Sequence, residues 1–294
     1  YGKMEKAKLD RIVDTIANNG DVIKAIDLAL ENEPGENWNR DLKKLKAFIV
    51  DGKARFTIIR QGNGKLPFLS FSALPGPDFC PGAGSCLSFC YSFKAWRFTA
   101  AFARQCQNTI LLNSANGKKQ IIAAIDLWLA KKAFRDLQAV DFRLYVDGDF
   151  RSKADVNFWF NVLRAKPQLA AYGYSKSFKQ LLQYAKDNKL PSNYVLNISA
   201  GHRHNATIEN QVMRLPIVRS TFESINMKAL GIKPDNGKYY SRQIVAKAYK
   251  AKKNKKAFVC PGLCGDCVKS KSGNLHFCGS KIEQHQIPVV IVEH

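Results

Sequence analysis

The sequence predicts an α/β fold in which a helical N-terminal leader precedes a mainly parallel sheet. Of its 294 residues 46% are hydrophobic, which allows a sizeable core and excludes a wholly disordered chain. Strand-like apolar runs alternate with amphipathic segments of helical length through the middle of the chain, and this alternation is typical of βαβ units. No apolar run is long enough for a membrane span, which needs about 18 residues.

Residues 1–50 are predicted to form the leader and residues 51–294 the α/β domain. Apolar residues recur at helical spacing from 5 to 32, with a break at Asn18-Asn19-Gly20, and Pro34-Gly35 ends this pair of helices. A third short helix is predicted from Leu42 to Phe48.

The α/β domain is predicted to begin with two strands, 54–59 and 67–72, around Gly62-Asn63-Gly64, which is a hairpin signal. The loop from Cys80 to Cys90 then leads into the alternating part. Its elements are expected to be helices 91–112 and 121–134, strand 140–146, helix 153–165, strand 170–174, helix 178–186, and strands 194–199, 215–218 and 285–292.

Polar residues follow three of the predicted strands, where the sites of parallel sheets usually lie. The candidate residues of this strand-end site are Asp147, Asp149, Lys176, His202 and His204. The two aspartates are able to bind a divalent metal, but capping of the following helix is the more usual role of such a residue. The two histidines flank Arg203 rather than an apolar residue, which disfavours a nickase of the replication-initiator kind.

The chain is strongly basic, with 46 Lys and Arg against 24 Asp and Glu and a net charge of +22. Basic and acidic residues balance within the leader, so the whole excess lies beyond residue 50. Such an excess attracts a polyanion, and we expect DNA or RNA as the partner. A charge that only keeps the protein soluble is the alternative.

The densest basic segment spans residues 238–256, lacks acidic residues and has interleaved tyrosines. Lysines neutralise phosphates and tyrosines stack on bases, although a solvated charged face is the common alternative. A second basic and aromatic stretch follows Cys90. The candidate nucleic-acid-binding residues are Lys238, Tyr239, Tyr240, Arg242, Lys247, Tyr249, Lys250, Lys252, Lys253, Lys255 and Lys256, with Lys94 and Arg97 in the second stretch.

Seven of the eight cysteines fall into two groups, which indicates metal or cluster ligation in a reducing, cytoplasmic compartment. Cys260, Cys264, Cys267 and Cys278 lie in a Cys-rich segment, 258–281, whose spacing favours a 4Fe-4S cluster over the alternatives of zinc and of unligated thiols. Cys80, Cys86 and Cys90 lie in a glycine-rich loop after an early strand. The remaining thiol, Cys106, is predicted to be part of the core.

Several of these motifs resemble the gene product 88 family of phages and plasmids. They are Cys80–Tyr91, Gly148-Asp149-Phe150, Tyr174–Ser177 and Cys264–Cys267, and the resemblance spans roughly residues 65–294. It implies a mobile-element protein with a partial α/β barrel, distantly similar to radical S-adenosylmethionine enzymes, and with iron–sulfur ligation. The family places another cysteine soon after the CGDC motif, where this chain has Val268-Lys269-Ser270, so Cys278 is the candidate for that role.

The sequence therefore predicts a 4Fe-4S protein that binds nucleic acid, with a cluster that is structural or redox-sensing. The rival hypothesis is an enzyme, either of the radical S-adenosylmethionine type or a metal-dependent nuclease. The CxxxCxxC spacing of such radical enzymes lies near the C-terminus here rather than after the first strand, and Cys278 is available to close the cluster. S-adenosylmethionine is therefore not expected as a cofactor. A zinc-stabilised interaction protein is the third possibility.

Overall fold

The computed structural model describes residues 4–31, 34–62, 68–262 and 287–293. Within them, eight strands form one sheet in the order β1-β2-β3-β4-β5-β6-β8-β7. The strands are β1 (Arg60–Gln61), β2 (Leu69–Ser70), β3 (Val140–Arg143), β4 (Leu169–Ser175), β5 (Tyr194–Ser199), β6 (Val218–Ile225), β7 (Phe258–Val259) and β8 (Val289–Val292). Only the pairing of β1 with β2 is antiparallel, so the predicted α/β class with a mainly parallel sheet is confirmed.

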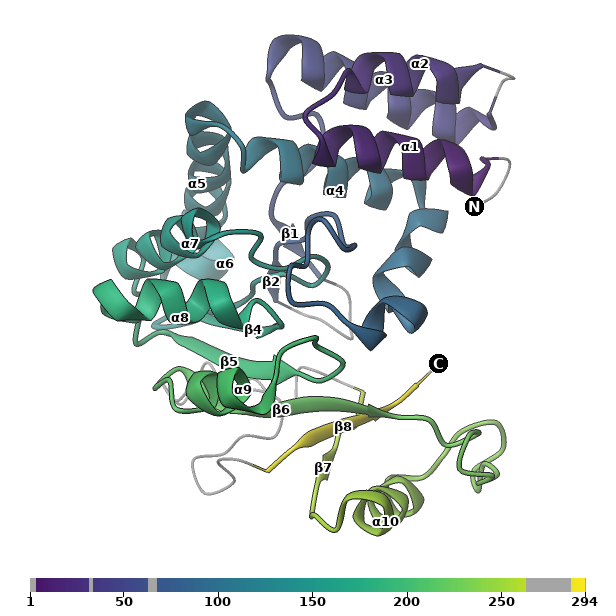
Figure 1. Cartoon of the computed structure of the whole chain (residues 1–294). Helices are drawn as coiled ribbons and strands as arrows, with labels where there is room; N and C mark the ends of the chain where they lie inside the picture. Colours follow the sequence, from purple (N-terminus) through teal and green to yellow (C-terminus); the bar gives the residue numbers. More distant parts are fainter. Residues whose placement is uncertain (1–3, 32–33, 63–67, 263–286, 294) are drawn as a thin grey trace.

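The leader folds into three helices that stack on a fourth at one end of the molecule (Figure 1). These are α1 (Lys6–Ala17), α2 (Val22–Leu30), α3 (Glu36–Asp51) and α4 (Thr99–Leu111). Trp38 of α3 packs edge-on against Phe102 of α4, with ring centroids 5.8 Å apart. The apolar side chains of the leader therefore lie in one core with those of the sheet and its helices.

The two faces of the sheet have different neighbours. Helices α7 (Lys153–Ala165), α8 (Phe178–Asp187) and α9 (Ala206–Met213) cover one face (Figure 1), and Leu196 and Ile198 of β5 belong to their core. On the opposite face, alternate residues of the same strands, Tyr172 and Val195 among them, form a second apolar cluster. We call this opposite side the inner face.

Three further α-helices and two 3-10 helices, η1 (Ser85–Phe89) and η2 (Tyr91–Arg97), belong to the described architecture. Helices α5 (Ala115–Leu129) and α6 (Lys132–Arg135) connect α4 to β3, and α10 (Arg242–Lys253) lies at the end of the molecule opposite the leader (Figure 1). Val245, Ala248 and Tyr249 on one side of α10 form a small core with residues of β6, β7 and β8. No helix in the described parts of the chain is both long and apolar enough to cross a membrane.

The predicted strand 54–59 is wrong, because this segment is held by side chains rather than by a neighbouring strand. The Gln107 amide accepts hydrogen bonds from the backbone N–H groups of Arg55 and Phe56, at 2.6 and 2.8 Å, and donates to the Phe56 carbonyl at 2.9 Å. The antiparallel pairing is present, but it joins β1 to β2. Residues 63–67, with most of the predicted turn, lie outside the described residues.

Other element boundaries also differ from the prediction. The helix expected over 91–112 is a 3-10 helix, η2 (Tyr91–Arg97), followed by α4, because Phe98 between them is extended, with φ −99° and ψ 111°. The strand expected at 215–218 is β6, which starts at Val218 and continues to Ile225. Most of its residues are polar, and its apolar residues Val218, Phe222 and Ile225 are separated, so no apolar run marks the strand.

Candidate functional site

The Cys80–Cys90 loop lies over the carboxyl ends of β4 and β5. The Gly84 and Cys86 N–H groups donate to the Gly201 carbonyl at 3.0 and 3.3 Å, and the Arg203 N–H donates to the Gly82 carbonyl at 3.0 Å. A Cβ atom on Gly82 would lie 1.6 Å from the Lys176 carbonyl oxygen, so only glycine permits this approach. Backbone contacts therefore attach the cysteine loop to the loops that follow two central strands.

All three cysteines of this loop are half-buried. Electrostatic neighbours of the Cys80 thiol are Asp149, Cys90 and Lys176. Burial, aided by the Asp149 carboxylate, raises the pKa of the Cys80 thiol well above its ordinary value. Among the described residues, no group of three or more His, Cys, Asp or Glu side chains is arranged to hold a metal ion.

The other predicted thiol ligands are placed only in part. Cys260 follows β7 and is half-buried against the apolar cluster of the inner face. Its Sγ accepts a hydrogen bond from the Gly262 N–H at 3.4 Å. Cys264, Cys267 and Cys278 lie outside the described residues. Cys106 is fully buried in the core, as predicted.

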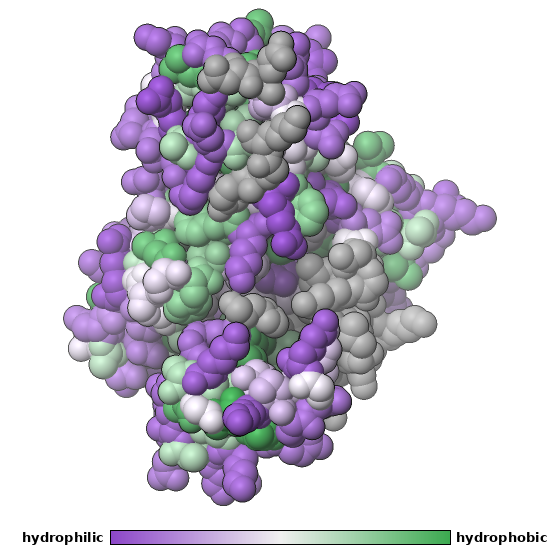
Figure 2. Space-filling model, turned by 90° about the vertical axis from the view of Figure 1, so that its right-hand side faces the viewer, coloured by the Kyte–Doolittle hydropathy of each residue, from purple (hydrophilic) through white to green (hydrophobic). Residues whose placement is uncertain are grey.

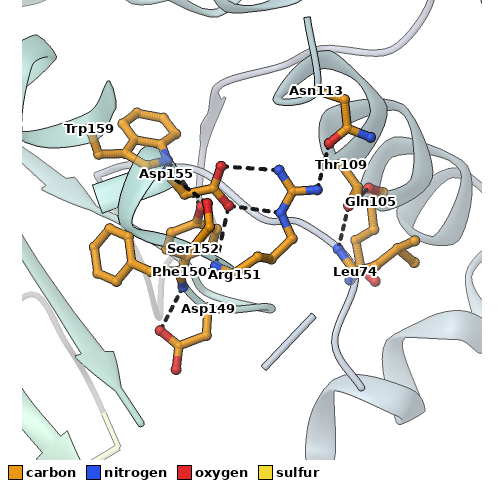
Figure 3. Close-up of polar contacts among 11 residues, drawn as sticks. Leu74, Gln105, Thr109, Asn113, Asp149, Phe150, Arg151, Ser152, Asp155 and Trp159 are labelled. Carbon is orange, nitrogen blue, oxygen red and sulfur yellow. Dashed lines mark hydrogen bonds and ion pairs between the residues drawn. The ribbon is translucent and has the colours of Figure 1, made fainter. Parts of the chain in front are cut away.

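Asp149 joins the end of β3 to the end of β4. Its carboxylate, 5% exposed, accepts hydrogen bonds from Ser175 Oγ and the Lys176 N–H, both at 2.7 Å. It also accepts a hydrogen bond from the Phe150 N–H at 2.8 Å (Figure 3). Burial raises the pKa of Asp149 above its ordinary value, although these hydrogen bonds oppose the rise. Ser152 caps α7 instead, accepting from the Asp155 N–H at 3.2 Å, so the helix-capping role predicted for the aspartates is wrong.

Asp147, which follows β3, is joined through Gln105 of α4 to Trp96 of η2. Its carboxylate is 8% exposed and accepts a hydrogen bond at 3.0 Å from Gln105, which in turn accepts from Trp96 Nε1 at 2.9 Å. Burial raises the pKa of Asp147. The backbone before it is strained, since Tyr145 has a φ of 58°, and such strain is common at functional sites.

A buried ion pair fixes the start of α7 beside the end of α4. Arg151 binds Asp155 through two nitrogens, at 2.8 and 3.1 Å, and donates to Asn113 at 2.8 Å (Figure 3). These three residues also line a cavity of about 390 Å³ between α1 and α7. This network joins the start of α7, next to the Asp149 loop, to the end of α4.

The two histidines organise loops rather than a metal site. The His204 Nε2–H donates to the Lys176 carbonyl at 2.8 Å, and His202 Nδ1 accepts from the His204 N–H at 3.2 Å. Both rings pack against Phe178, at 4.6 and 4.8 Å between centroids. The remaining predicted strand-end residue, Lys176, donates through Nζ to Ser199 Oγ at 2.7 Å.

The basic residues of the 238–256 segment lie on the exposed side of α10 and on the loops that flank it. Arg242 donates to the Val259 carbonyl at 3.1 Å and lies over the Phe258 ring. The exposed basic residues are Lys238, Arg242, Lys247, Lys250, Lys252, Lys253, Lys255 and Lys256. Viewed toward the carboxyl ends of the strands, the described surface is largely hydrophilic (Figure 2).

The predicted tyrosines differ in their access to solvent. Tyr249 is 2% exposed and belongs to the core under α10, so the prediction that its ring stacks on a base is wrong. Tyr240 is half-buried and donates to the Ile232 carbonyl at 3.2 Å. Tyr239 is 64% exposed, with the Lys238 ammonium 5.4 Å from its ring centroid. In the second stretch Lys94 and Arg97 are exposed, and Arg97 lies over the Phe98 ring.

A set of inner-face residues was missed from the sequence. Arg143, Tyr174, Asn197 and Phe222 come from four neighbouring strands, and they meet only because of the strand order and register. Arg143, Asn197 and Phe222 belong to no local motif, and Tyr174 was named only as the first residue of the motif Tyr174–Ser177. Asn197, a polar residue inside the predicted strand 194–199, was the one available signal.

The fold and the site define the class of protein as a parallel α/β protein whose polar and thiol groups gather at the carboxyl ends of the strands. The family model for gene product 88 matches residues 43–268, which is more than half of the chain. The chain therefore belongs to the gene product 88 family. No curated protein and no solved structure matches it.

Proposed function

We propose that this protein is an iron–sulfur protein of a phage or plasmid that binds nucleic acid. The observation that carries the proposal is the position of the three-cysteine loop, which backbone hydrogen bonds hold over the carboxyl ends of the parallel strands. Sites in parallel α/β folds lie at this end of the sheet. The thiols are thus presented where the fold usually places a cofactor.

The donor set fits a cluster by its chemistry. Cys80, Cys86 and Cys90 are soft thiol ligands on one short loop, and thiolates are the usual ligands of 4Fe-4S centres. Cluster binding would draw these thiols together, in keeping with the general coupling of metal binding to local folding. The bound cluster would supply a structural anchor or a redox-sensitive contact for the loop. Zinc bound by the same thiols is the alternative.

Charge supports the nucleic-acid partner. The excess of +22 lies outside the leader, and α10 buries one side while its basic residues project from the other. Exposed lysines without acidic neighbours in sequence bind phosphates by releasing counterions. The exposed Tyr239 beside Lys238 offers one stacking platform.

Anaerobic purification followed by iron, sulfide and zinc assays tests the cluster. We expect a brown protein with about four irons per cluster, and loss of the iron in Cys86→Ser and Cys90→Ser. Cys106→Ala is the matched control, because that thiol lies in the core away from the loop. A colourless protein with stoichiometric zinc, or full iron content in both loop variants, would overturn the iron–sulfur assignment.

One observation favours an enzyme as the second candidate. The three-cysteine loop follows β2, the first strand of the parallel part of the sheet, and it lies near the buried Asp149. A cluster held by three thiols keeps one iron available to a small molecule such as S-adenosylmethionine. Formation of 5′-deoxyadenosine under reducing conditions, above the level in a Cys86→Ser control, would support this candidate. We expect none, because the sequence offers Cys278 as a fourth thiol ligand.

A further inference from the structure

The inner face of the sheet holds a buried amide that has no hydrogen-bond partner in the described part of the chain. Asn197 lies in the middle of β5 and is fully buried, and neither its Nδ2 nor its Oδ1 is bonded to any described residue. An unsatisfied polar group of this kind lowers stability. Native proteins bury few such groups, and each calls for an explanation.

Two hydroxyls on the same face as Asn197, one on β6 and one on β5, are engaged elsewhere. Ser220 is its register partner on β6, but Ser220 Oγ donates to the Ile287 carbonyl at 2.6 Å. Ser199, two residues along β5 on the same face, accepts the hydrogen bond from Lys176 Nζ. Among the described residues, the Asn197 amide therefore keeps its donor and its acceptor free. It lies in a row of polar side chains formed with Ser199 and Ser220.

Aromatic rings from both neighbouring strands meet above β5. Tyr174 of β4 is the register partner of Asn197, and Phe222 of β6 is the register partner of Ser199. Their ring centroids are only 4.3 Å apart, with an interplanar angle of 43°. Since β5 runs between these two strands, the ring pair covers the amide, and both residues are half-buried.

Cationic groups flank this aromatic pair. The guanidinium of Arg143 lies 4.9 Å from the Tyr174 ring centroid and 6.0 Å from that of Tyr172. Lys176 follows Tyr174 by two residues at the end of β4. An amide donor and acceptor, two aromatic rings and nearby cations together match a planar base that is attached to phosphate.

We propose that Asn197 is the base-recognition residue of a closed pocket, which takes an adenine base when Tyr174 and Phe222 part. The amide of asparagine pairs with the adjacent acceptor and donor on the edge of adenine. The parted rings stack on the two faces of the base, and Arg143 and Lys176 face its phosphate. The inference rests on the proposed function in one respect, since it takes the base from a nucleic acid rather than from a free nucleotide.

Affinities of 12-nucleotide single strands, dA12 and dT12, at one salt concentration test the pocket, with 5′-AMP as a separate probe. We expect the wild type to prefer dA12 about tenfold, and Asn197→Leu to lose this preference. The leucine variant should also melt at a higher temperature than the wild type, by roughly 2 °C or more, because it replaces an unsatisfied amide with an apolar group of similar size. Ser220→Ala is the control from the same row and should keep the preference.

The outcomes distinguish a failure of the pocket from a failure of the proposed function. Salt-dependent binding with equal affinity for dA12 and dT12 in the wild type overturns the pocket and leaves the proposed function standing. A lower melting temperature in Asn197→Leu shows that the amide is structural, and it also overturns the pocket. Without any oligonucleotide binding the proposed function fails, whereas AMP binding that depends on Asn197 would assign the pocket to a free nucleotide.

Discussion

The loops at the carboxyl ends of the strands and the surface of α10 carry polar groups in different ways. In the loops, buried groups are matched one by one, as in Asp149 with its three donors. On α10, the lysines project from a helix whose other side is buried. Single contacts thus determine the loop geometry, whereas the α10 surface depends on summed charge. A single substitution should therefore disrupt the loops, whereas several substitutions are needed to abolish nucleic-acid binding by the α10 surface.

The largest single-residue effect is expected at the buried side of α10. Tyr249→Ala should lower the free energy of unfolding by about 3–5 kcal/mol, since it empties a core position. Urea denaturation measures this loss, and Tyr249→Phe should recover most of the stability. A stable alanine variant with weakened DNA binding would instead make Tyr249 a surface residue.

Gly82→Ala tests the close contact that holds the cysteine loop. The added Cβ would overlap the Lys176 carbonyl, so the cysteine loop must move. We expect a loss of about 2–3 kcal/mol in the free energy of unfolding, together with loss of iron. Ser85→Ala, at an exposed position in the same loop, is the control. Unchanged stability and iron content in Gly82→Ala would show that the loop is not held by this contact.

A smaller effect is expected at the exposed tyrosine. Tyr239→Ala should leave the melting temperature unchanged and weaken single-strand binding by about 1–2 kcal/mol, the value of one stacked base. Fluorescence anisotropy with a labelled single strand measures the change. Affinity equal to that of the wild type would remove Tyr239 from the interface.

The smallest effect concerns the pH dependence of stability. Because burial raises the pKa of Asp147 above its ordinary value of 3.8, the folded state binds this proton more tightly than the unfolded state. The stability that protonated Asp147 contributes to the folded state is fully present below pH 3.8. It is lost as the pH rises through the pKa of Asp147 in the folded state. Asp147→Asn should therefore flatten the fall in the free energy of unfolding over this range. If the free energy of unfolding depends on pH identically in Asp147→Asn and the wild type, the raised pKa of Asp147 is contradicted.

The sequence allowed prediction of the elements that carry strong apolar patterns. Strand 194–199 was predicted with its observed bounds, and helix 178–186 to within one residue. Helix α10 was not predicted, because its segment was interpreted only as a basic stretch. Val245, Ala248 and Tyr249 nevertheless have helical spacing. The leader was predicted as a neutral layer, but its packing on α4 through Trp38 and Phe102 depends on tertiary contacts that periodicity does not encode.

The candidate site was predicted only as a group of loops. Strand-end polarity identified Asp149 and Lys176, but not the hydrogen bond between them, which depends on the β3–β4 register. The loop contact between Gly84 and Gly201 joins segments that are more than a hundred residues apart. Such contacts follow from the strand order, which the periodicity of a single sequence does not encode.

Binding affinity as a function of salt concentration tests the central claim of nucleic-acid recognition most directly. The wild type and a variant with Lys250, Lys252, Lys253, Lys255 and Lys256 changed to Glu are compared on one DNA fragment at 50 and 200 mM salt. We expect the wild-type affinity to fall by roughly 10³ or more if about six phosphates are engaged, and the variant not to bind. Salt-insensitive binding, or wild-type affinity in the variant, would contradict the account.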